Sequence, residues 1–204
     1  SARTLPTQGA KVRLSIDAEV TQGLYDAIEA RAKASNFQAG SGVMMDVETG
    51  EVIALTSYPE YSTQAVSSGD KEALRGALAD TRQAFLNRAV NGLYSPGSIV
   101  KPFMGVAVLT EGVIDENKEI LSTGSISLPN PYDPSKPSIF KDWRAHGWVD
   151  LRHAIAVSSD VYFYAVGGGF GDQPGIGIDR IDKYFRLFGF EKVTGLLGFD
   201  DPTG

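Results

Sequence analysis

The clearest pattern near the start of the chain is a segment with apolar residues at helical spacing. Positions 20, 24, 27, 28 and 32 are apolar and recur every three or four residues, as in a helix with one buried face. Asp17 stands before this segment, where a side-chain oxygen can cap the first N–H groups. Glu19 falls in the first turn, where the helix dipole favours negative charge. The pattern predicts an amphipathic helix over residues 18–34.

Two short apolar runs with a turn between them follow this helix. Residues 43–47 and 51–56 flank a turn that ends in Gly50, which can adopt the positive φ of a tight turn. The pattern predicts a β-hairpin. Residues 1–16 form an N-terminal arm that ends in a strand-like run, 12–16. After the arm, the hairpin supplies the only good strands that we predict.

From residue 70 onward the pattern is helical and broken by loops. Gly112 and Gly189 stand where C-terminal caps belong. Four prolines between residues 128 and 138 predict an extended loop. One hairpin followed mostly by helices is an unusual combination, because a two-stranded sheet is only marginally stable by itself. The predicted helices cover residues 71–79, 81–86, 98–111, 150–157, 160–166 and 178–188.

Composition and charge narrow the class of protein. With 204 residues and 42% apolar side chains, the chain can bury the core of about one domain, which excludes intrinsic disorder. The net charge of −6 disfavours binding to nucleic acid. The absence of cysteine excludes disulfide scaffolds, cysteine-ligated zinc and thiol catalysis. We find no apolar run long enough to span a membrane and no signal-peptide pattern.

The strongest chemical signal is a serine and a lysine three residues apart at the start of a predicted helix. Pro102 is tolerated only in the first turn of a helix, which places Ser98 at or near the helix N-terminus. The helix dipole there favours developing negative charge, and Lys101 falls on the same face as Ser98. A neutral Lys101 amine could then accept the serine proton.

The spacing alone is weak support, because the chain holds seventeen serines and nine lysines and Ser-x-x-Lys occurs three times. The other two pairs are Ser68–Lys71, in a Ser/Gly loop, and Ser138–Lys141, in the proline-rich stretch. The local context therefore selects the pair at the start of the helix.

A second polar feature, Ser158-Ser159-Asp160, interrupts an apolar helical run. The Ser158 hydroxyl could relay a proton between Lys101 and a leaving group. Asp160 could hold Lys101 or a substrate amide. Ser-x-Asp also occurs at Ser15–Asp17 and Ser68–Asp70, where it is typical of helix N-caps. The triplet could equally be only the cap of the following helix.

Several further segments are typical of one protein family. They are Val12–Gln22, Val43–Leu55, Tyr58–Tyr61, Asn87–Ala89, Pro96–Ser98, Lys141–Trp143, His146–Gly147 and Asp160–Tyr164. Together with the two serine motifs, they resemble the penicillin-binding proteins and serine β-lactamases, and more narrowly the elongation-type class B penicillin-binding proteins. The resemblance implies an α+β fold, with an antiparallel sheet flanked by helices. Residues 1–16 would be an arm from an upstream domain, and residues 17–204 a partial transpeptidase domain.

The resemblance also implies a serine acyl-transfer enzyme without a cofactor. Ser98 would be acylated by a D-Ala-D-Ala peptide or a β-lactam, with Lys101 as general base and Ser158 as proton shuttle. Asp160 stands where most members have Asn, and a carboxylate there would favour the charged form of Lys101. The implied partners are peptidoglycan stem peptides, β-lactams and a membrane-embedded glycosyltransferase, with no nucleic acid. The implied location is the periplasmic side of the cytoplasmic membrane, with the anchor outside this chain.

The family's third motif, Lys-Thr/Ser-Gly, does not occur as a contiguous sequence. Residues 191–195 come near it with one extra residue, but a one-residue slip in a strand turns side chains to the opposite face. We therefore expect the third motif and the last strands of the family's sheet beyond Gly204. We also expect the isolated chain to be poorly active, because half of the oxyanion hole would be missing.

Other functions stay open at this point. A β-lactamase or β-lactam sensor would need a deacylating base after the second motif, where Glu191 is the only glutamate. A non-catalytic scaffold would fit the missing third motif. A metal site at Asp142 and His146 is a weaker alternative. Gly167–Gly171 follows a helix, not a strand, which predicts a loop and not a phosphate cradle.

Overall fold

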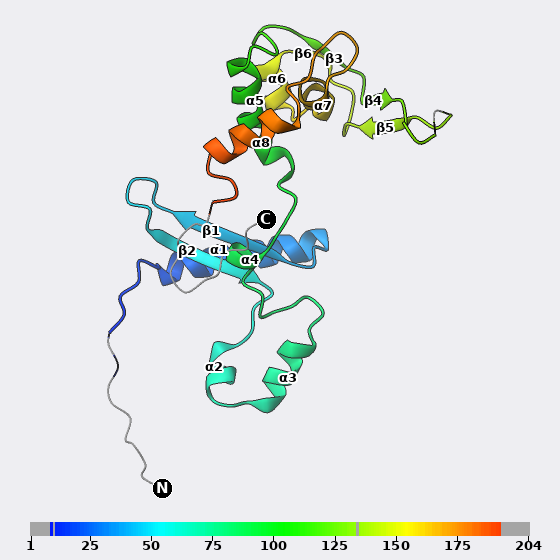
Figure 1. Cartoon of the computed structure of the whole chain (residues 1–204). Helices are drawn as coiled ribbons and strands as arrows, with labels where there is room; N and C mark the ends of the chain where they lie inside the picture. The colour runs from blue at the N-terminus through cyan, green and yellow to red at the C-terminus, as the bar shows by residue number, and fades with distance from the viewer. Residues whose placement is uncertain (1–8, 10, 134, 193–204) are drawn as a thin grey trace. The chain divides into compact units, whose positions relative to one another are not determined.

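The computed structural model of the chain describes residues 9, 11–133 and 135–192, which form two compact units, one up to Leu93 and one from Tyr94 to Lys192. In the first unit, α1 (Ala18–Ser35) lies along the antiparallel hairpin of β1 (Gly40–Met45) and β2 (Val52–Tyr58), as Figure 1 shows. The remaining elements of this unit are three short helices, α2 (Thr63–Ser67), α3 (Lys71–Ala79) and α4 (Arg88–Asn91).

Local chemistry fixes both ends of α1 and its approach to the hairpin. The Asp17 carboxylate accepts a hydrogen bond from the Val20 N–H at 3.0 Å, as predicted for an N-cap. At the other end, Asn36 adopts the left-handed conformation and its N–H binds the last carbonyls. A side chain at Gly40 would lie 2.8 Å from Ile28 Cγ2, so the glycine allows helix and strand to approach closely. The predicted helix over 18–34 and the predicted hairpin are confirmed.

The helix predicted over residues 81–86 is wrong, because these residues form turns. The Asp80 carboxylate accepts hydrogen bonds from the backbone and side chain of Arg82, which folds the chain locally. Gln83 then has a φ of 55°, which interrupts a right-handed helix. The buried Arg88 guanidinium binds the carbonyls of Gln83 and Leu86 at 3.1 and 3.4 Å, which turns those carbonyls away from helical partners.

The strand-like run over residues 12–16 is not a strand either. The Ser15 hydroxyl donates to the Val52 carbonyl at 2.8 Å, so the arm touches β2 there. The side chains of Val12 and Leu14 are nevertheless 81% and 71% exposed. A strand in this position would have no apolar face to bury, which removes the main reason for it to pair.

The second unit is built around a small helical core. The 3₁₀ helix η1 (Gly97–Val100) leads directly into α5 (Lys101–Thr110), and α6 (Leu151–Ala156), α7 (Asp160–Gly168) and α8 (Ile178–Leu187) complete the core. Gly112 and Gly189 have φ values of 64° and 92°, as predicted for C-terminal caps. None of the helices in the described part of the chain is long and apolar enough to cross a membrane.

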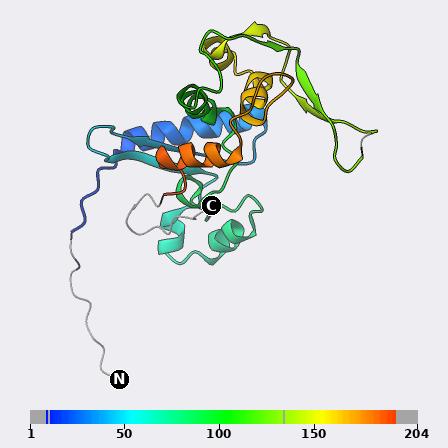
Figure 2. The same cartoon turned by 45° about the horizontal axis from the view of Figure 1, so that its top comes forward.

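Four short strands in the second unit correct the expectation that the first hairpin supplies the only good strands. β3 (Ile120–Ser122) pairs with β6 (Gly147–Val149), and β4 (Ser125–Leu128) pairs with β5 (Ser138–Lys141), both antiparallel. Strands of three or four residues are too short to show the alternation that predicts a strand. The proline-rich stretch joins β4 to β5, and Figures 1 and 2 show this hairpin extending away from the helices of its unit.

Candidate active site

Lys101, the first residue of α5, is the centre of a polar cluster. Its side chain is buried, with only 7% of the residue exposed. The Lys101 Nζ donates to the Ser158 carbonyl at 2.8 Å and to the Ser158 hydroxyl at 3.1 Å. It also forms an ion pair with Asp160 Oδ1 at 2.5 Å. The structure thus brings together three of the four predicted site residues from segments 57 to 59 residues apart in the sequence.

Ser98, the fourth predicted residue, lies in η1, one turn before Lys101. Its carbonyl accepts a hydrogen bond from the Lys101 N–H, so both residues belong to one continuous turn. Residues three apart in a 3₁₀ helix lie above one another, which places Ser98 and Lys101 on the same side. Ser98 is exposed, and within the described residues no hydrogen bond joins its hydroxyl to Lys101 Nζ. The nucleophile candidate is accessible, and its hydroxyl is not yet engaged by the lysine.

Ser158 occupies the left-handed position that follows α6, with a φ of 56°. The Ser159 N–H binds the Ala154 carbonyl at 2.9 Å, and the Ser158 N–H binds the Ile155 carbonyl at 3.1 Å. This pattern is a Schellman motif, in which the left-handed residue is usually glycine. A non-glycine residue there is unfavourable by about 1–2 kcal/mol. The conformation turns both the carbonyl and the hydroxyl of Ser158 toward Lys101.

Ser159 and Asp160 begin α7, and they divide two roles between them. The Ser159 hydroxyl accepts a hydrogen bond from the Tyr162 N–H and caps the helix. Asp160 is the first helical residue, and its side chain, 32% exposed, reaches Lys101 instead of capping the helix. In this triplet, the middle residue Ser159 therefore caps α7, and the outer residues Ser158 and Asp160 bind Lys101.

The competing Ser-x-x-Lys pairs have ordinary surroundings. Ser68 ends α2 and Lys71 begins α3, where Asp70 caps the helix by accepting from the Glu72 and Ala73 N–H groups. Ser138 and Lys141 lie on β5, where residues three apart point to opposite faces of the strand.

The near-miss third motif lies mostly outside the described residues, which end at Lys192. Glu191, the candidate deacylating base, has a φ of 64° and pairs with Arg186 Nη2 at 2.5 Å. Its carboxylate is therefore engaged at the end of α8.

Asp142 and His146, the candidate metal pair, lie side by side in the interior. Their side chains are 0% and 1% exposed, and His146 Nε2 lies 3.4 Å from Asp142 Oδ1. Among the described residues, no group of three or more histidine, aspartate or glutamate side chains could hold a metal ion. Asp142 binds instead to the residues around Asp160, through Ser159 and Val161, a role that no local sequence pattern indicates.

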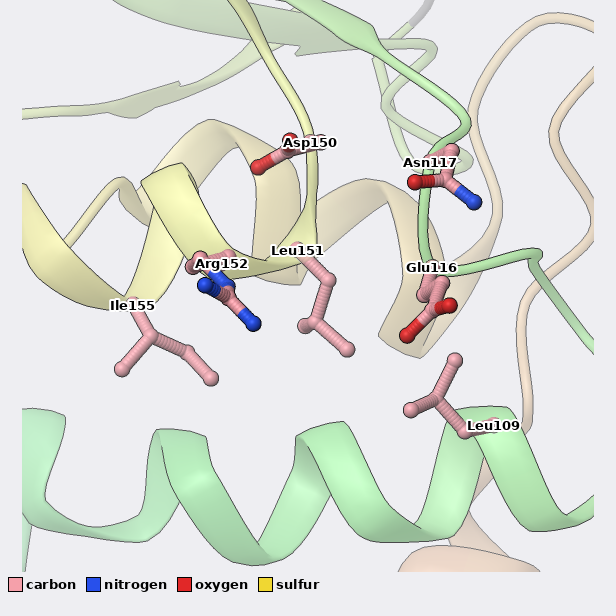
Figure 3. Close-up of a pocket in the computed structure, with 7 residues that line it drawn as sticks. All are labelled: Leu109, Glu116, Asn117, Asp150, Leu151, Arg152 and Ile155. Carbon is pink, nitrogen blue, oxygen red and sulfur yellow. The ribbon is translucent and has the colours of Figure 1, made fainter.

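A pocket of about 380 Å³ lies at the opposite end of α5 (Figure 3). Its charged side chains come from the loop after α5 and from the start of α6. None of the four candidate residues lines it, so this pocket is separate from the polar cluster around Lys101. The lining residues are Leu109, Glu116, Asn117, Asp150, Leu151, Arg152 and Ile155.

Comparison with known families and solved structures identifies the class of protein. Residues 40–202 match the penicillin binding protein transpeptidase domain, and the chain belongs to that family. PBP2 of Pseudomonas aeruginosa in complex with WCK 5153 superposes with a TM-score of 0.71 at 30% identity, over 92% of this chain and 40% of that one. PBP2 from Helicobacter pylori gives 0.74 at 30% identity, over 94% and 34%. The chain has the penicillin-binding protein transpeptidase fold, which confirms the predicted fold class.

Within this family the chain is similar to PBP2, as the sequence indicates. It is 37% identical over 160 residues to the peptidoglycan D,D-transpeptidase MrdA of Haemophilus influenzae, covering 77% of this chain and 23% of that protein. It is 30% identical over 205 residues to MrdA of Escherichia coli K12, covering 98% and 29%. The chain therefore spans about a quarter of the length of these relatives.

Proposed function

We propose that this chain is part of a D,D-transpeptidase that cross-links peptidoglycan stem peptides through an acyl-enzyme on Ser98. The observation that carries the proposal is the contact of Lys101 with Ser158 and Asp160, one turn after an exposed serine. The MrdA relatives are named peptidoglycan D,D-transpeptidases, which supports the proposal.

Acylation of Ser98 is the first chemical step. The Ser98 oxygen forms a bond to the carbonyl carbon of the penultimate D-Ala, and its proton passes to a neutral Lys101 amine. The peptide C–N bond then breaks, and the departing D-Ala amine takes up a proton. That proton comes from Lys101 through the Ser158 hydroxyl, which lies 3.1 Å from Nζ, within the range for proton transfer.

Asp160 holds Lys101 in place. Its Oδ1 lies 2.5 Å from Nζ, which keeps the amine beside the Ser158 hydroxyl. In the proposed reaction Lys101 acts in its neutral form, as the acceptor of the Ser98 proton.

The second half of the reaction releases the enzyme. The amine of a neighbouring stem peptide attacks the ester carbonyl, its proton returns through Ser158 and Lys101, and Ser98 leaves as the hydroxyl. A β-lactam enters by the same acylation, because its ring amide presents a carbonyl and a C–N bond to Ser98. After the ring opens, the leaving amine remains covalently attached to the acyl group, where it hinders the approach of an acceptor amine.

The proposal includes an envelope location, on the periplasmic side of the cytoplasmic membrane, where peptidoglycan is assembled. Residues 1–16 then form an arm from an upstream domain and residues 17–204 part of the catalytic domain. Proposed partners are a membrane-embedded glycosyltransferase and a protein similar to MreC. The second partner is supported by a solved complex between PBP2 and MreC from Helicobacter pylori, whose PBP2 is 31% identical to this chain with a TM-score of 0.64.

Labelling with a fluorescent penicillin tests the proposal on the full-length protein. Ser98→Ala should abolish labelling, whereas Ser138→Ala, in the competing Ser-x-x-Lys pair, should leave it intact. Loss of labelling in Ser138→Ala with retention in Ser98→Ala would overturn the assignment.

The lifetime of the label distinguishes the β-lactamase alternative, because a transpeptidase holds its acyl group whereas a β-lactamase releases it rapidly. A wild-type protein that folds but takes no label would support the non-catalytic alternative.

A further inference from the structure

Beneath the Ser158–Asp160 turn lies a buried carboxylate that the proposed chemistry does not use. Asp142 follows β5 directly, and its side chain is fully buried. Its backbone N–H binds the Gly124 carbonyl at 2.9 Å, and the His146 N–H binds the Ser122 carbonyl at 3.0 Å. The short strands β3 to β6 therefore position Asp142 at the start of α7.

The Asp142 carboxylate binds the turn on both sides of Asp160. Its Oδ2 accepts a hydrogen bond from the Ser159 hydroxyl at 2.9 Å and another from the Val161 N–H at 3.0 Å. The residues before and after Asp160 are thus held by a single oxygen atom. The Asp160 side chain is left to face Lys101.

The neighbouring Trp143 holds the other side of the turn. Its indole N–H donates to the Val157 carbonyl at 3.1 Å, directly before Ser158. Asp142 and Trp143 together therefore bind the backbone or side chain of residues 157, 159 and 161. Ser158, in a left-handed conformation that serine rarely adopts, lies between these contacts.

We infer that Asp142 is a positioning residue of this site, which holds the Ser158–Asp160 turn and through it Lys101 in the geometry for acylation. The inference rests on the proposed function. A carboxylate suits this role because it only accepts hydrogen bonds, and the groups that hydrogen-bond to it are all donors. Further donors are the Ser122 hydroxyl, at 3.3 Å from Oδ2, and the Trp143 N–H, at 2.8 Å from Oδ1.

The carboxylate stays ionised in this interior. Burial alone would raise the pKa of Asp142, but the hydrogen bonds from Val161, Ser159 and Trp143 and the nearby His146 outweigh burial and lower the pKa below its ordinary value. The binding site for the turn is therefore present throughout the neutral pH range.

The test measures acylation of the full-length protein by a fluorescent penicillin, as a rate constant at saturation and a separate non-covalent dissociation constant. Asp142→Ala should slow acylation by about 10- to 100-fold, as expected when reacting groups are misplaced by about 1 Å. The dissociation constant should stay close to that of the wild type. Asp142→Asn should recover most of the rate, because its amide oxygen can replace Oδ2 and accept from Ser159 and Val161.

A matched control separates positioning from general destabilisation. Glu111, at the other end of α5, binds Lys183 at 3.0 Å and the Tyr184 hydroxyl at 2.9 Å. Glu111→Ala should lower the melting temperature and leave the acylation rate unchanged. If Asp142→Ala fails to fold, Trp143→Phe removes the indole donor while keeping an aromatic ring at this position, and it should slow acylation by about 2- to 10-fold.

Two results would overturn the inference and are distinguishable from failure of the proposed function. If Asp142→Ala is acylated at the wild-type rate, the turn needs no such support. Where Asp142→Ala does not fold, acylation of Trp143→Phe at the wild-type rate would show the same. Equal slowing in Asp142→Ala and Glu111→Ala would show a general loss of stability. If Ser98→Ala is instead acylated at the same rate as the wild-type protein, the proposed function itself is overturned.

Discussion

At the scale of single residues, Lys101 shows how a buried charge is accommodated at this site. An ammonium removed from water is unfavourable unless it is paired and hydrogen-bonded. Three oxygen atoms from Ser158 and Asp160 surround Nζ, and the ring of Phe163 lies 5.7 Å away. The lysine is therefore fixed in one position, where the proposed reaction requires it to act as a neutral base.

Lys101→Arg tests that requirement. Arginine keeps the positive charge and can still bind Asp160, but it does not become neutral in proteins. We expect the acylation rate constant to fall by about 10²- to 10⁴-fold, the range for loss of general base catalysis. Time courses of penicillin labelling measure this rate. An arginine variant that is acylated as fast as the wild type would exclude Lys101 as the base.

Asp142 gives the domain a pH-dependent stability whose direction is set by its lowered pKa. Since the folded-state pKa lies below the ordinary value of 3.8, the stabilisation is complete above about pH 4 and is lost as the pH falls through the folded-state value. Asp142→Asn should therefore lower the melting temperature at pH 7, and the difference from the wild type should shrink in strong acid. A difference of equal size at pH 7 and in acid would contradict this account.

At the scale of elements, the junction of α6 and α7 combines helix termination with chemistry. The Schellman motif that ends α6 requires a left-handed residue at position 158, and the chain places a serine there. The positive φ of Ser158 is unfavourable for serine, but in this conformation both the hydroxyl and the carbonyl of Ser158 contact Lys101.

A pair of variants at Ser158 separates strain from chemistry. Ser158→Gly and Ser158→Ala both remove the hydroxyl, so both should lose acylation activity to a similar extent. Glycine tolerates positive φ and alanine does not, so Ser158→Gly should exceed Ser158→Ala in free energy of unfolding by about 1 kcal/mol. Denaturant unfolding measures this difference. Equal stability of the two variants would show that the left-handed backbone stores no strain.

The elements that could be predicted from sequence are those whose causes are local. The caps Asp17 and Asp70 act on residues two or three positions away, and both predictions are correct. The start of the helical segment near Ser98 also follows from Pro102, which is tolerated only in the first turn of a helix. By contrast, the failed helix over 81–86 depends on Arg88, whose guanidinium binds the carbonyls of that segment.

The same distinction applies to the site. Ser98 and Lys101 are visible as a pair because one helical turn joins them, and Ser158 and Asp160 are visible as a triplet. Their assembly over 57 to 59 residues is suggested by the chemistry of these residue types and implied by the family resemblance, but no local pattern fixes it. Asp142 lies 17 and 19 residues from its partners in the turn, and the strands that place it have only three or four residues. No local pattern could predict that contact.

At the scale of the whole molecule, the candidate chemistry is concentrated in one unit. Ser98, Lys101, Ser158, Asp160 and the supporting Asp142 all lie between Tyr94 and Lys192, whereas the family match extends over residues 40–202. The proposed acylation therefore concerns one serine in the second unit, where it can be tested directly.

The most direct measurement is peptide mapping by mass spectrometry after the full-length protein has reacted with penicillin. If Ser98 is the nucleophile, the protein carries one penicilloyl adduct, on the peptide that contains Ser98, and the adduct disappears in Ser98→Ala. An adduct on Ser138 or Ser158, or no adduct on a folded wild-type protein, would contradict this assignment.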